Sequence, residues 1–101
     1  MIDNAERKAI AIEILKQLGG NRFIAMTGAK NFGIMSDKPG IAFSIPRANK
    51  VKYIRIALNS MDTYDMEFLN TKIQVIDKEA DIYNDQLQST FTAHTGLYTH
   101  L

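Results

Sequence analysis

The first twenty residues place apolar side chains at helical spacing. Apolar positions recur every three or four residues, as one face of a helix requires. They are Ala11, Ile14, Leu15 and Leu18. Asp3 and Glu6 have the spacing of a capping box at the start of a helix. Gly19 and Gly20 supply the left-handed backbone that commonly ends one. The pattern predicts an N-terminal helix that ends near Leu18.

After this helix the period of the pattern changes to two. In the segment RFIAMT (22–27), apolar residues fall on both sides of the alternation. This is typical of a strand that is covered on both faces or lies at a subunit contact. We therefore predict a strand at 22–27. Either a homodimer contact or helices on both faces of the sheet would explain its two apolar sides.

Further alternating segments predict an antiparallel meander. They are FGIMS (32–36), IAFSI (41–45), VKYIRIAL (51–58), TYDMEF (63–68) and the weaker TKIQVI (71–76), with a turn at DKPG (37–40). The expected inward residues are Ile41, Phe43, Ile45, Ile54, Ile56, Leu58, Tyr64, Met66 and Phe68. For Leu58 and Tyr64 to share a face, the loop between their strands must hold an odd number of residues. A loop of about three residues would set Arg55 opposite Asp65 or Glu67.

The C-terminal part of the chain carries the signals of a second helix. Asp77 is a candidate N-cap, with Glu79 and Asp81 in the first turn, where negative charge suits the helix dipole. The expected buried stripe is Ile82, Tyr83, Leu87 and Phe91, and the residues expected to fold back after Gly96 are Leu97, Tyr98 and Leu101. The predicted fold class is α+β: an N-terminal helix, an antiparallel β-meander of five or six strands, and a C-terminal helix packed on the sheet.

Composition is that of a globular domain. The chain has 101 residues, of which 46% are hydrophobic and 23% charged, so we expect one domain over 1–101. The absence of cysteine excludes disulfides, thiolate nucleophiles and cysteine zinc sites. No apolar run is long enough to span a membrane, and the N-terminus lacks the apolar region of a signal peptide. A cytoplasmic location is therefore expected.

Charge is distributed unevenly along the chain. Residues 20–58 carry seven basic groups against one acid, and residues 59–101 carry two basic groups against seven acids. Within the basic part, Arg47, Lys50, Lys52, Tyr53 and Arg55 place cations beside an aromatic ring on one expected strand face. Sheet proteins bind single-stranded nucleic acid with such residues. The alternative is that the basic half pairs with the acidic half, which the near-neutral total of +1 favours.

The stretch QLGGNRFIAMTGAKNFG (17–33) is glycine-rich and contains a lysine, but it is not a phosphate-binding loop. That motif needs G-x-x-x-x-G-K-[ST] between a strand and a helix, whereas here Gly28 is followed by Ala29 and the helix comes first. The glycines are interpreted as corners between elements.

Other catalytic and metal-binding patterns are also lacking. Asp65 and Glu67, with Asp62 nearby, alternate with core positions as solvent-facing residues do. His94 and His100 lack the i, i+4 spacing of helical metal ligands. No serine has a G-x-S-x-G context. We therefore predict no enzyme activity, no catalytic residue, no cofactor and no metal site.

Four blocks of the chain carry a resemblance to a known family. LGGNRFIAMTGAKNF, LNSMDTYDMEF, IYNDQLQSTF and the terminal TGLYTHL resemble a family of small proteins of unknown function carried by bacteriophages and other mobile elements. The resemblance implies a small accessory protein acting inside bacteria, and it brings no reaction or cofactor with it. The leading hypothesis is a non-enzymatic protein that binds a host or phage protein, and the alternative is a nucleic-acid-binding protein that uses residues 47–55.

Overall fold

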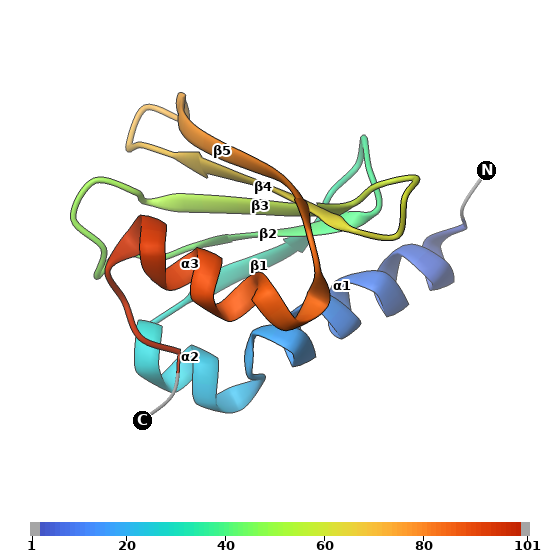
Figure 1. Ribbon diagram of the computed structural model, residues 1–101, viewed down its shortest axis with the longest axis horizontal. Coiled ribbons are helices and arrows are strands. Elements are labelled where there is room, and N and C mark those ends of the chain that lie inside the picture. The colour runs from blue at the N-terminus through green and yellow to red at the C-terminus, as the bar shows by residue number, and fades with distance from the viewer. Residues whose placement is uncertain (1–2, 100–101) are drawn as a thin grey trace.

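Five antiparallel strands form one sheet, and three helices cover one of its faces, as the computed structural model shows for residues 3–99 (Figure 1). The strands follow one another across the sheet in chain order: β1 (Lys30–Ile34), β2 (Gly40–Ser44), β3 (Tyr53–Leu58), β4 (Tyr64–Leu69) and β5 (Val75–Ile82). The helices are α1 (Asn4–Leu18), α2 (Asn21–Thr27) and α3 (Leu87–Thr95), the last preceded by the 3-10 turn η1 (Asn84–Gln86). The predicted α+β fold class is confirmed.

Helix α1 forms where the sequence predicts it. The Asp3 carboxylate accepts a hydrogen bond from the Glu6 amide at 2.8 Å, as an N-cap does. At the other end, the Gly19 amide donates to the carbonyls of Leu15 and Lys16. Its apolar stripe faces the sheet, because Ala11, Ile14 and Leu18 are buried. The helix is confirmed.

The segment at 22–27 is a helix, so the predicted strand is wrong. Phe23 and Thr27, four residues apart, are both fully buried, and the Thr27 hydroxyl donates to the Phe23 carbonyl at 2.7 Å. Gly28 ends the helix in the left-handed conformation with φ of 71°. A segment of six residues is too short for its pattern to distinguish the period of a helix from that of a strand. The burial of Phe23 against other elements determines that it is a helix. The sheet therefore has five strands, and the argument for a homodimer from a two-sided strand no longer applies.

The central strands have the predicted faces. Leu58 is partly buried and the other predicted inward residues are buried. Ile54 lies opposite Phe68, and Arg55 lies opposite Glu67. The connecting loop spans residues 59–63, an odd number as the register requires, but it is longer than the predicted three-residue loop. The Asn59 side chain explains the longer loop, because its Oδ1 atom accepts hydrogen bonds from the amides of Met61 and Thr63.

The start of the C-terminal helix was predicted too early. Asp77, Glu79 and Asp81 belong to β5, which is hydrogen-bonded to β4, and α3 begins only at Leu87. The strand predicted at 71–76 is wrong before Val75, where β5 begins, because residues 71–73 form the turn from β4. Leu87 and Phe91 are buried as predicted, and Gly96 ends the helix. Leu97 packs against the core as predicted, and Ile82 is buried as predicted but belongs to β5. The predicted burial of Tyr83 and Tyr98 is wrong because both are exposed, and Leu101 lies outside the described residues.

Three phenylalanines join the helical layer to the sheet. The Phe23 ring of α2 meets Phe43 of β2 and Phe91 of α3 edge to face, with ring centroids 5.6 and 5.0 Å apart. All three rings are nearly or fully buried. This cluster fixes α2 and α3 on one half of the sheet, while α1 packs mainly on β2. Within residues 3–99, no helix is long and apolar enough to cross a membrane.

Candidate functional site

An apolar groove lies between α1 and the edge strand β1. We call it the α1–β1 groove and define it by the residues that line most of it: Lys8, Ile12, Leu15, Phe32, Ile34 and Ile41. Its volume is about 410 Å³. One wall comes from the helix and the other from the strand. Because β1 pairs only with β2 within the described part of the chain, the groove opens onto a free strand edge.

The position of α1 leaves this groove uncovered. Since the helix packs mainly on β2, the helix-facing side of β1 has little above it. The Phe32 ring packs against Phe43 in a tilted arrangement, with centroids 5.2 Å apart, but Phe32 stays 36% exposed, and Ile34 is 48% exposed. Ile12, across the groove on α1, is 50% exposed. Large apolar side chains that gather at one exposed place mark a binding surface more often than isolated ones do.

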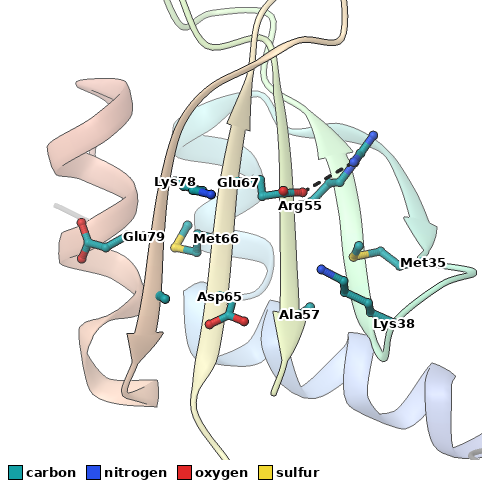
Figure 2. A pocket seen from close by; sticks show the side chains of 10 residues that line it. Met35, Lys38, Arg55, Ala57, Asp65, Met66, Glu67, Lys78 and Glu79 are labelled. Atoms are coloured by element: carbon teal, nitrogen blue, oxygen red, sulfur yellow. Dashed lines mark ion pairs between the residues drawn. The ribbon is translucent and has the colours of Figure 1, made fainter. Parts of the chain in front are cut away.

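A second hollow lies on the opposite face of the sheet and is lined by charged residues (Figure 2). Arg55 and Glu67 face each other there, with 3.5 Å between Nη1 and Oε1, and Lys78 is paired with Glu67 in the sheet register. Asp65 accepts hydrogen bonds from the Asn59 amide group and the Asp81 backbone. Glu67 is therefore engaged by Arg55, and Asp65 by two amide groups. Asp65 and Glu67 face away from the core, as the sequence predicts.

The five predicted nucleic-acid-binding residues do not share one strand face. Arg47, Lys50 and Lys52 lie in the loop before β3. Arg47 turns toward α2 and donates to the Ala25 carbonyl at 3.4 Å, and Lys52 donates to the carbonyls of Pro46 and Ala48. Tyr53 and Arg55 lie on the outer face of β3, where Arg55 is paired with Glu67. The structure thus separates this group, and nucleic-acid binding stays a prediction.

We expect short single- and double-stranded oligonucleotides to bind only weakly, because three of the four cations already contact groups of the protein. Fluorescence anisotropy at about 50 and about 200 mM salt measures this directly. Micromolar binding at the lower salt, with a steep loss at the higher, would contradict the expectation. Lys52→Glu combined with Arg55→Glu would then show whether these residues carry the binding.

A histidine between two carboxylates was not foreseen. Nδ1 of His94 lies 2.5 Å from Oδ2 of Asp77, and Nε2 lies 2.9 Å from Oε1 of Glu79. The ring also stacks on Phe68 with centroids 4.3 Å apart. Ionised carboxylates only accept hydrogen bonds, so the two contacts favour the protonated imidazole, in which both ring nitrogens donate. The cluster joins α3 to β5 and leaves no ring nitrogen free for a proton transfer or a metal.

Removing His94 is expected to remove a pH dependence of stability. Burial lowers the pKa of His94, but the hydrogen bonds and charges of Glu79 and Asp77 outweigh it, so the pKa lies above its ordinary value of 6.5. A raised folded-state pKa stabilises the fold fully below the unfolded value, and the contribution is lost as pH rises through the folded value. Urea unfolding at about pH 6 and about pH 8 should show this loss in the natural protein.

The variant His94→Gln is the control for this prediction. It should show a smaller difference between the two pH values than the natural protein does. His100 lies outside the described residues and is present in both proteins, so its contribution to the pH dependence of stability is common to both and cancels when they are compared. The same pH dependence in both proteins would contradict a protonated His94 clamp.

No known family, curated protein or solved structure matches the chain. The resemblance to phage and mobile-element proteins therefore stays a prediction.

Across residues 3–99, no three histidine or acidic side chains converge so that they could hold a metal ion. The α1–β1 groove was not predicted from the sequence. The one signal for it in the sequence is the pair of apolar residues Phe32 and Ile34, two positions apart.

Proposed function

We propose that this protein is a non-enzymatic protein-interaction module that docks a segment of a partner protein in the α1–β1 groove. The observation that supports the proposal is the joint exposure of Ile12, Phe32 and Ile34 beside a free strand edge. Burying apolar surface is favourable by about 25 cal/mol per Å², so a partner that covers these side chains gains affinity from each of them.

The strand edge itself favours an interaction. Proteins commonly protect free edges with charged residues or proline, because an open edge pairs with other chains. All five residues of β1 are exposed. Lys30 and a register shift lie at the start of the strand, whereas the part from Phe32 to Ile34 carries neither a charged residue nor proline. The outer face of the sheet offers less to an apolar partner, since several charged side chains line it. The resemblance to phage and mobile-element proteins leads us to expect the partner among bacterial host or phage proteins in the cytoplasm.

Selection from a library of random displayed peptides tests the proposal. The immobilised protein is expected to enrich peptides whose affinity falls about tenfold or more in Ile34→Lys, since one well-packed contact contributes on this scale. Ile12→Lys should weaken them from the other wall of the groove. Ile76→Lys is the matched control, because Ile76 is 45% exposed but lies on β5, the other edge strand.

Thermal unfolding of each variant shows whether the fold is intact. The proposal is wrong if folded Ile34→Lys and Ile12→Lys variants bind the enriched peptides as tightly as the natural protein. It is also wrong if the library yields no peptide that binds the natural protein above background.

A further inference from the structure

We infer, on the basis of the proposed function, that the occupant of the α1–β1 groove is an extended acidic segment that joins the sheet as a sixth strand beside β1. The inference specifies the conformation and the charge of the partner. It depends on three features of the groove: the direction of the β1 backbone groups, the spacing of its apolar side chains, and Lys8 at one end, which forms no ion pair within residues 3–99.

The backbone of β1 has groups that point away from the sheet. The Met35 amide donates to the Gly40 carbonyl at 3.0 Å, and Gly33 is paired with Ala42 of β2. In an antiparallel ladder, successive residues direct their amide and carbonyl to opposite sides. Ile34 therefore directs these groups toward the open edge, while a register shift between Lys30 and Gly33 interrupts the regular ladder before it. A peptide beside Ile34 can form strand hydrogen bonds, as in recognition by strand addition.

The apolar side chains of β1 match the period of a strand. Phe32 and Ile34 are two residues apart, and both line the groove on the helix-facing side. The side chains of an added strand also alternate between faces, so every second one would lie beside Phe32 or Ile34 and opposite Ile12. The docked segment must therefore carry apolar residues two positions apart, at i and i+2.

Two cations that form no ion pair with a carboxylate of residues 3–99 lie at one end of the groove. Lys8 lines it and forms no ion pair within residues 3–99. Arg7, the next residue, donates to the carbonyls of Met35, Ser36 and Lys38 just past the end of β1. The groove lining contains no acidic residue. An aspartate or glutamate of the partner would meet Lys8 here, which is the charge complementarity that selects an acidic segment.

The groove could also be occupied by a partner helix or by a second copy of this chain, and its geometry and charge disfavour both. A partner helix satisfies its backbone groups internally, so it would leave the amide and carbonyl of Ile34 without a strand partner. A second copy of this chain would bring another Lys8 to the shared interface without an acidic residue from its own groove lining. An extended acidic segment uses both the free edge and the positive charge.

Synthetic versions of the peptides enriched by the natural protein test the inference. We expect alternating apolar residues with at least one aspartate or glutamate. Replacing that acid by its amide, or changing Lys8→Glu, should weaken binding about fivefold, and less at high salt. Lys72→Glu is the matched control, because Lys72 is exposed in the turn between β4 and β5. Methylating the backbone nitrogen of a central peptide residue on the β1 side should abolish binding.

The outcomes separate this inference from the proposed function. Peptides that depend on Ile34 but carry apolar residues at helical spacing, or that ignore the acid and Lys8 changes, overturn the inference and leave the groove as a docking site. A dimer in sedimentation equilibrium that Ile34→Lys disrupts also overturns it, since the occupant is then a second copy. Enriched peptides that ignore Ile34→Lys and Ile12→Lys, or a selection that yields none, overturn both.

Discussion

Replacing Phe23 by alanine is expected to lower the free energy of unfolding by about 3–5 kcal/mol. The Phe23 side chain is fully buried, and its ring contacts Phe43 and Phe91 edge to face. Truncation removes the apolar contacts that join α2 to β2 and to α3, and it leaves a cavity between these elements. A loss of this size is a large part of the 5–15 kcal/mol that stabilises a typical domain.

Equilibrium urea unfolding of Phe23→Ala measures the loss. Phe32→Ala is the matched control, because Phe32 also contacts Phe43 but is 36% exposed at the groove. We expect this control to cost about 1 kcal/mol, as partial burial predicts. Equal losses for the two variants would contradict the assignment of Phe23 to the centre of the core.

Gly40→Ala is expected to destabilise the protein by about 3 kcal/mol or more, at or beyond the upper end for overpacking. A methyl group on Gly40 would lie 2.1 Å from the Ile56 carbonyl oxygen and 2.8 Å from the Ala57 Cα atom. Both are backbone atoms of β3, so no side-chain rotation relieves the contact. Strands β2 and β3 would have to separate where the Leu58 amide donates to the Pro39 carbonyl.

Gly33→Ala provides the comparison within the same sheet. A methyl group there meets no atom within 4 Å, and Gly33 has no positive φ. We expect its free energy of unfolding to stay within about 0.5 kcal/mol of the natural value. If Gly40→Ala is as stable as Gly33→Ala, the close approach of β2 and β3 is wrong.

The central strands were predictable because local pattern and final environment agree. The alternation of Ile54 and Ile56 with Arg55, and of Met66 and Phe68 with Glu67, is the alternation that a sheet covered on one face requires. Register followed from the same pattern, since a shift by one residue would expose the whole buried set.

Two elements were mispredicted because their local signals fit more than one structure. The six residues at 22–27 match both a strand and a helix, and the packing of Phe23 decides. The acids from Asp77 to Asp81 resemble the first turn of a helix, but β4 offers hydrogen bonds to this segment. The carboxylates of Asp77 and Glu79 then meet His94, which lies far along the chain on α3. Contacts between distant residues determined both outcomes.

The groove was not predictable because it depends on the placement of one element on another. In the sequence, Phe32 and Ile34 look like ordinary inward residues of a strand. They are exposed because α1 packs mainly on β2 and leaves β1 uncovered. The predicted basic group failed to form one face for a similar reason, since Arg47 and Lys52 contact carbonyl groups of neighbouring segments.

The most direct test of the docking surface is a titration of the ¹⁵N-labelled protein with the tightest selected peptide, followed by amide NMR shifts and hydrogen exchange. Docking in the α1–β1 groove predicts shift changes concentrated on β1 and the facing side of α1, with slower exchange of the Ile34 amide once it donates to an added strand. Shift changes concentrated on the outer face around Arg55, Glu67 and Lys78, with β1 unaffected, would contradict it.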